Sequence, residues 1–150
     1  MNFRIDAVLP ADVWQIWRIF FDPPRIAALI PGCENVKEVE PLVSYSALLN
    51  QKIGPFRMSV PTRIVVEERS EPHRVRLRAS GQDRITATRL DVSLHVDLAP
   101  AEQGGTRLGV DSTLQVAGRL ATLGYPVVKK KSEELFAEFE RRLRAELGAA

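Results

Sequence analysis

The stretch that decides the fold is Leu90-Asp91-Val92-Ser93-Leu94-His95-Val96-Asp97-Leu98, in which apolar and polar residues alternate without interruption. Alternation with a period of two is typical of a β-strand that has one buried face and one face in water. Two earlier segments show the same pattern. In residues 43–53 the odd-numbered positions are mainly apolar, and in residues 56–66 the even-numbered positions are. Both segments are therefore predicted strands with a single inner face.

Turn-forming residues separate these runs at positions 40–41, 54–55, 70–72, 81–83 and 103–105. Further alternating runs occur at 75–79 and 108–116, and residues 3–9 alternate in the same way. The sequence therefore predicts seven antiparallel strands, one at the start of the chain and six in a meander.

Ile85 and Ala87 occupy odd-numbered positions, whereas the inner set of residues 90–98 is even-numbered. We interpret this change of parity near Thr88 as a β-bulge. A bulge bends a strand and increases its twist, which would help the sheet to curl.

Helical spacing appears in three other segments. Residues 11–21 carry apolar side chains on more than one face, and residues 25–30 form a second short helix after the break at Asp22-Pro23-Pro24. Residues 118–147 form a long terminal helix, in which Pro126 marks a kink or the true start. The predicted fold class is α+β. A seven-stranded curved antiparallel sheet wraps around the C-terminal helix, with two short helices after the first strand, as in the helix-grip architecture.

The composition is that of one folded domain, which we expect to span residues 1–150. Hydrophobic residues make up 45% of the chain, charged residues 27%, and the net charge is +2. These values exclude intrinsic disorder and argue against a dedicated nucleic-acid-binding protein. The single cysteine, Cys33, cannot form an intrachain disulfide or a multi-cysteine metal site. Neither a secretory signal nor a membrane span is recognisable. We therefore expect a cytoplasmic protein. Any contact with the membrane should be peripheral and at the inner face of the cell membrane.

Strong catalytic motifs are absent from the sequence, which contains no nucleophile elbow, zinc-protease pair, Walker loop or dinucleotide fingerprint. His73 lies in a turn and His95 on an outer strand face, so both are expected at the surface. The inward polar candidates are Tyr45, Gln51 and Thr62, none of which ordinarily titrates near neutral pH. We therefore expect no catalytic residue, no metal site and no cofactor.

Two basic groups need a separate interpretation. The outer-face arginines Arg74, Arg76 and Arg78 have no interleaved aromatic residues, so we interpret them as a solvated face with acidic partners rather than as a nucleic-acid site. The run Lys129, Lys130 and Lys131 follows an apolar stretch directly. It is either a docking surface for an anionic membrane or acidic partner, or a solvated helix turn partly offset by nearby glutamates.

The inner face between the sheet and the terminal helix is the predicted ligand-binding site, because concave apolar surfaces are where small ligands bind. Flexible Met58 and small Gly124 would leave space there. The expected ligand-binding residues are Tyr45, Leu49, Phe56, Met58, Val60, Leu123, Gly124, Val127, Val128, Leu135 and Phe139.

Several motifs resemble those of the carbon monoxide dehydrogenase G-subunit family, a branch of the polyketide-cyclase/START-like (SRPBCC) superfamily. They are Ile30-Pro31-Gly32-Cys33-Glu34 after Asp22-Pro23-Pro24, then Lys52-Ile53-Gly54-Pro55-Phe56, Gly104-Gly105-Thr106-Arg107-Leu108 and residues 116–124. The resemblance implies the helix-grip fold. It also implies a noncatalytic accessory protein of molybdenum-containing carbon monoxide dehydrogenase or a related oxidoreductase, which associates with the membrane and handles an apolar ligand such as a lipid or quinone.

The segment Ser80-Gly81-Gln82-Asp83-Arg84 departs from the glycine-rich middle strands that are common in the family. Three hypotheses stay open at this point. The preferred one is a noncatalytic carrier of an apolar ligand. The alternatives are a cyclase or dehydratase-type enzyme in which Tyr45 and Gln51 orient the substrate, and a structural partner whose core is simply filled.

Overall fold

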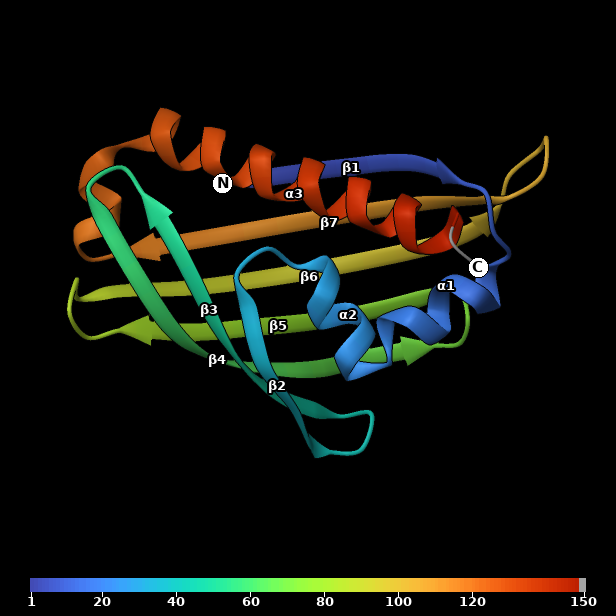
Figure 1. The fold of residues 1–150 in the computed structure, drawn as a ribbon, viewed down its shortest axis with the longest axis horizontal. Helices are drawn as coiled ribbons and strands as arrows, with labels where there is room; N and C mark the ends of the chain where they lie inside the picture. The colour runs from blue at the N-terminus through green and yellow to red at the C-terminus, as the bar shows by residue number, and fades with distance from the viewer. Residues whose placement is uncertain (149–150) are drawn as a thin grey trace.

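Seven strands form one antiparallel sheet in the order β1-β7-β6-β5-β4-β3-β2, so the predicted strand number and sheet type are confirmed (Figure 1). The structure is a computed structural model that describes residues 1–148; the last two residues of the expected domain lie outside the described part. The strands are β1 (Asn2–Leu9), β2 (Cys33–Glu40), β3 (Ser44–Ile53), β4 (Phe56–Ser70), β5 (Arg74–Asp83), β6 (Thr88–Pro100) and β7 (Thr106–Ala117).

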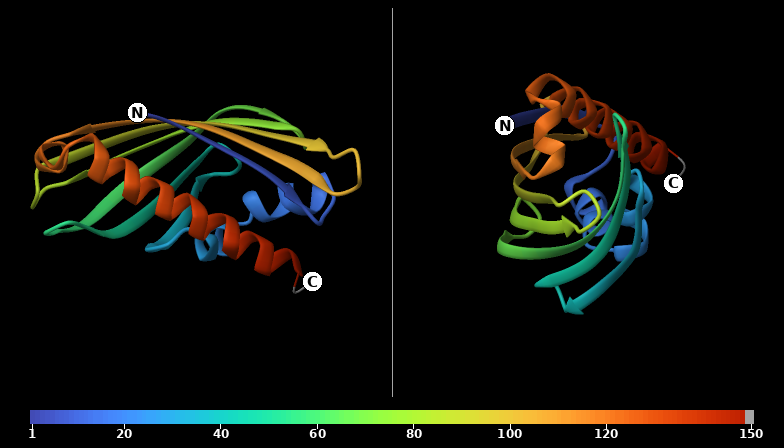
Figure 2. Two further views of the ribbon diagram at one scale, coloured as in Figure 1. Left: turned by 90° about the horizontal axis from the view of Figure 1, so that it is seen from above. Right: turned by 90° about the vertical axis from the view of Figure 1, so that its left-hand side faces the viewer.

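The alternation within β6 has the predicted consequence. Leu98 is buried and its even-numbered neighbours are half-buried, whereas His95 on the other face is exposed. The sheet curls strongly, and α3 (Tyr125–Gly148) runs along its concave side (Figure 2). The fold is therefore the helix grip that the sequence predicts.

The predicted bulge near Thr88 is wrong. Strand β5 continues to Asp83, through the segment that was expected to turn, and residues 84–87 form the turn itself. The hairpin turn resets the parity, so no extra residue within a strand is needed. The register shift occurs instead in β4, between Val66 and Glu68. That irregularity and two others in the β2–β3 pair help to bend the sheet.

The two short helices are α1 (Val13–Phe20) and α2 (Pro23–Leu29). Asp12 and Asp22 cap them, because each carboxylate accepts a hydrogen bond from a backbone N–H three residues later. Pro23 begins α2 rather than preceding it, since the first helical positions need no N–H donor. The terminal helical segment is also divided: a 3-10 helix, η1 (Arg119–Leu123), precedes α3, and Pro126 occupies the first turn of α3.

The apolar core consists of two separate clusters. The α1/α2 cluster fills one end of the molecule, where side chains of both short helices meet the sheet and the C-terminal part of α3, including Ile16, Leu108 and Leu143. The η1 cluster fills the other end and has Met58, Val60, Leu120, Val128 and Ile53 at its centre. Several inner-facing residues belong to neither cluster.

Candidate functional site

A band of inner-facing residues separates the two clusters, and we call it the central strip. Tyr45, Ile64, Ala79 and Val92 are successive neighbours across β3, β4, β5 and β6. Ala47 and Thr62 form the adjacent pair, and Leu135 of α3 is a half-buried apolar residue that likewise belongs to neither cluster. None of these seven described residues belongs to either apolar cluster.

The central strip is incompletely covered. Ile64, Ala79, Val92 and Leu135 are half-buried, although the first three lie on the concave face of inner strands. The main backbone neighbours of α3 are α2, η1, β1 and β3, whereas the central strands β4, β5 and β6 are not among them. Small side chains such as Ala47 and Ala79 face this region, and it lies apart from the pocket beside the start of α3 that is described below.

Tyr45 is the outstanding polar group of the central strip. Its side chain is 9% exposed, and its Oη atom is buried without a hydrogen-bond partner. A buried hydroxyl without a partner is unfavourable, and native proteins usually avoid it. Burial raises the pKa of Tyr45, and so does the carboxylate of Glu38, its direct neighbour across the β2–β3 pair, which is close enough to act as an acceptor for the phenol proton. The phenol is therefore neutral at physiological pH and available as a hydrogen-bond donor.

The other inward polar candidates already have partners. Gln51 Nε2 donates to the carbonyl oxygen of Pro31 at 2.5 Å, and Thr62 Oγ1 donates to that of Val60 at 3.0 Å. Tyr45 is thus the inward polar group without a partner in hydrogen-bonding geometry, and Glu38 is the acceptor with which a ligand would compete for its proton. With its raised pKa, Tyr45 is a poor general base at neutral pH, so the strip offers hydrogen bonding rather than acid–base chemistry.

The expected ligand-binding residues occupy several environments. Met58, Val60 and Val128 are buried in the η1 cluster, and Leu49, Phe56 and Leu123 pack against it. Phe139 packs against the α1/α2 cluster and Phe20, with ring centroids 6.3 Å apart. Tyr45 lies in the central strip, and Leu135 is half-buried outside both clusters. Val127 is 40% exposed, although its helical spacing placed it on the inner wall.

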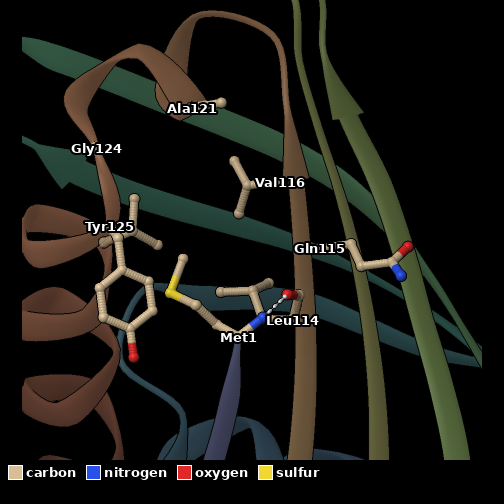
Figure 3. Close-up of a pocket in the computed structure, with 8 residues that line it drawn as sticks. Met1, Leu114, Gln115, Val116, Ala121, Gly124 and Tyr125 are labelled. Atoms are coloured by element: carbon tan, nitrogen blue, oxygen red, sulfur yellow. Dashed lines mark hydrogen bonds between the residues drawn. The ribbon is translucent and has the colours of Figure 1, made fainter.

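A pocket of about 340 Å³ opens beside the start of α3 (Figure 3). Gly124 and Val128 of the expected set contribute to it. The remaining lining residues were not anticipated: Met1, Leu114, Gln115, Val116, Ala121 and Tyr125. Met1 N donates to the Leu114 carbonyl oxygen at 2.9 Å, which fixes one wall, whereas the Gln115 amide points away from the group. The parity of residues 110–116 places Leu114 and Val116 on the inner face, but no local signal places Met1 beside them.

The two histidines and the outer-face arginines, which were not expected to form a site, are at the surface or in ion pairs. His73 and His95 are exposed. Arg74 pairs with Asp97 at 3.2 Å, and Arg76 pairs with Glu68 at 3.3 Å, as expected for a solvated sheet face.

Cys33 is half-buried, and desolvation together with the charge of Glu34 raises the pKa of its thiol, so it has little thiolate character. Within residues 1–148, no three His, Cys, Asp or Glu side chains gather as a metal ion would require. No helix in the same range has both the length and the apolar character to cross a bilayer.

Comparison with known proteins agrees with this geometry. The family model of the carbon monoxide dehydrogenase G subunit (CoxG) matches residues 3–148. A conserved protein from Geobacillus kaustophilus has a similar structure, with a TM-score of 0.90 at 20% identity, covering 99% of this chain and 96% of that one. A Thermus thermophilus protein gives a TM-score of 0.74 at 14% identity, covering 99% and 98%.

A Mycobacterium smegmatis protein gives a TM-score of 0.71 at 19% identity, with coverage of 99% and 91%. None of the curated proteins matches the chain in sequence. At these identities the solved structures show that the helix-grip fold is shared, and the family model covers nearly every described residue. The chain therefore belongs to the carbon monoxide dehydrogenase G-subunit (CoxG) family.

Proposed function

We propose that this protein is a noncatalytic carrier that holds an apolar ligand, a lipid or a quinone, between the sheet and α3. Its family membership supports an accessory role beside molybdenum-containing carbon monoxide dehydrogenase or a related oxidoreductase. In this role the protein binds the ligand near the inner face of the membrane and presents it to the enzyme, without changing it chemically.

The observation that carries the proposal is the unpartnered Tyr45 Oη at a central strip built largely from small and half-buried side chains. An apolar ligand with one polar acceptor, such as the carbonyl oxygen of a quinone, would satisfy both features. Its apolar body would cover Ile64, Ala79 and Val92, and its oxygen would accept the hydrogen bond from Tyr45. A purely aliphatic ligand would leave the hydroxyl unsatisfied.

The test is native mass spectrometry of protein purified without detergent, because it reports the mass and the stoichiometry of a retained ligand together. We expect one apolar molecule for each chain. Protein freed of this ligand should bind a short-tailed ubiquinone, measured by quenching of tryptophan fluorescence. Protein that retains no ligand and shows no binding of added quinone or fatty acid would contradict the proposal.

A further inference from the structure

Strand β1 is an open edge of the sheet. It pairs with β7 over all of its residues, Asn2–Leu9, without a register shift, and no other strand of the described chain lies beside it. Figure 1 shows β1 as the outermost strand, with β2 at the opposite edge of the sheet. An edge strand presents a row of free backbone N–H and C=O groups, to which a further strand can bind.

The free backbone groups of β1 can be assigned from one pair of hydrogen bonds. Met1 N donates to the Leu114 carbonyl oxygen at 2.9 Å, and Leu114 N donates to that of Met1 at 2.8 Å. In an antiparallel pair, every second residue bonds to the same neighbouring strand. The odd-numbered residues of β1 therefore direct their backbone groups to β7. The residues that direct theirs to the open edge, and whose side chains are exposed, are Asn2, Arg4, Asp6 and Val8.

Two other surfaces are less suited to pair with a partner. The β2 edge is irregular, because its ladder with β3 is interrupted twice, and such irregularities resist the addition of a strand. The lysine run at the start of α3 is not a uniform basic face. Lys131 is half-buried, and Lys129 lies 3.8 Å from the Glu133 carboxylate. The regular edge of the sheet is therefore β1.

The inner side of β1 is apolar and only partly covered. Phe3 and Ile5 are half-buried, although they face the concave side of the sheet. The ring of Phe3 lies against that of Phe136 in α3, which is also half-buried, with ring centroids 5.8 Å apart. A strand added at the open edge would cover part of these side chains. Pairing there would therefore gain apolar contact as well as backbone hydrogen bonds.

Charge selects the register in which two copies of β1 can pair. When the strands run antiparallel with their free backbone groups facing each other, the central alignments are Arg4 with Arg4, Asp6 with Asp6, or Arg4 with Asp6. Like charges directly opposite each other are destabilising, whereas opposite charges attract. The third alignment is therefore favoured. It places Ile5 opposite Ile5 on the two-fold axis and Asn2 opposite Val8.

We propose that β1 binds β1 of a second copy of this chain, antiparallel, with Arg4 of each copy opposite Asp6 of the other. The product is a symmetric dimer in which one continuous sheet runs through both copies. The side chains of Arg4 and Asp6 are 47% and 60% exposed. They can therefore contact the other copy while keeping the 2.9 Å ion pair within their own chain.

The first test is sedimentation equilibrium of the full chain over a range of concentrations. We expect a monomer–dimer equilibrium with a micromolar Kd and a dimer of twice the 16.8 kDa of one chain. A protein that stays monomeric up to millimolar concentration would overturn the proposal. The measurement needs no added quinone, so its result is independent of the ligand-carrier proposal.

Charge reversal tests the register. Arg4→Asp brings acidic side chains opposite each other, and Asp6→Arg does the same for basic ones. Each variant alone should dimerise on the order of tenfold more weakly, because two symmetry-related pairs change from attraction to repulsion. An equal mixture of the two variants should form a mixed dimer as tight as that of the unmodified protein, because every acidic side chain then faces a basic one. A mixture that dimerises no better than the separate variants would overturn the proposal.

Two control variants carry matched charge reversals on the opposite edge of the sheet. Lys37→Glu and Glu40→Lys alter exposed side chains of β2. Both should dimerise with the Kd of the unmodified protein, and circular dichroism checks that all four variants are folded. If the β2 variants lose as much dimer as the β1 variants, the copies do not meet through β1 and the proposal fails.

Cross-linking reads the register directly, in protein that carries Cys33→Ser. Directly opposite residues that are not hydrogen-bonded to each other have Cα atoms about 4.5 Å apart, within the range of a disulfide. Ile5→Cys should therefore give a disulfide-linked dimer on mild oxidation. Phe3→Cys should not, because Phe3 of one copy faces Ala7 of the other. A dimeric sample in which Ile5→Cys does not cross-link, or in which Phe3→Cys cross-links as well, would refute the register.

Discussion

Replacing Tyr45 with Phe removes one buried oxygen and changes nothing else in the central strip. The Tyr45 Oη atom has no hydrogen-bond partner in the ligand-free protein. An unsatisfied buried hydroxyl costs about 1–3 kcal/mol, and because Glu38 lies close enough to affect the pKa of Tyr45, the lower end of that range applies. We therefore expect Tyr45→Phe to stabilise the ligand-free protein by about 1 kcal/mol, which in a chain of this size raises the Tm by about 2–4 °C.

The same substitution should weaken ligand binding. In the complex the phenol donates to the ligand oxygen, and a hydrogen bond between neutral groups contributes about 0.5–1.5 kcal/mol net. Its loss raises the Kd for a quinone by roughly 2- to 13-fold. The two effects have opposite signs, which distinguishes a binding group from an ordinary core residue.

The assay combines thermal unfolding of ligand-free protein with fluorescence titration of a short-tailed ubiquinone. Ser80→Ala is the matched control, because Ser80 carries an exposed hydroxyl on the outer face of β5, beside Ala79. It should leave the Kd unchanged. A lower Tm together with an unchanged Kd for Tyr45→Phe would refute the assignment, since it would mean that the hydroxyl stabilises the fold and does not bind the ligand.

Three further predictions concern the strip, the turn and the terminal helix. Ala79→Phe should place a phenyl ring in the central strip and abolish quinone binding, while the Tm falls by less than about 4 °C; fluorescence titration and thermal unfolding measure this. Thr88→Val should lower the free energy of unfolding in urea by about 1–3 kcal/mol, because the buried N–H of Leu120 loses its acceptor. The arginines of the following helical turn lower the pKa of Glu138 from 4.5 to about 2, so Glu138 stabilises the fold above pH 4.5 and progressively less as the pH falls to about 2. Glu138→Gln should therefore unfold at a lower temperature than the unmodified protein at pH 7, and at the same temperature near pH 2.

Each of these predictions has its own check. Ser80→Phe adds the same ring to the outer face and should leave quinone binding intact; equal loss of binding in both variants would argue against an internal site. Thr113→Val replaces an exposed threonine of β7 and should change the stability far less than Thr88→Val. A destabilisation by Glu138→Gln that persists at low pH would show that its carboxylate charge is not the cause.

The sequence alone determined the sheet and the inner face. The alternation in residues 90–98 and in the segments before them depends only on the two-residue period of a strand, so side chains such as Val60 and Leu98 could be assigned to the interior without any knowledge of their partners. The same reasoning placed Tyr45 and Ala79 on that face. It failed where one local pattern had two structural causes: the parity change at Ile85 is produced by a turn as readily as by a bulge.

Only the tertiary structure decided which inner residues form a site. Whether Tyr45 Oη finds a partner depends on strands and helices that are distant in sequence, as does the division of the core into two clusters. The position of the β5–β6 turn is likewise set by a long-range contact, because the backbone nitrogen of Leu120 donates to Thr88 Oγ1. A sequence pattern shows which face a side chain occupies, whereas its contacts and its free hydrogen bonds are set by long-range packing.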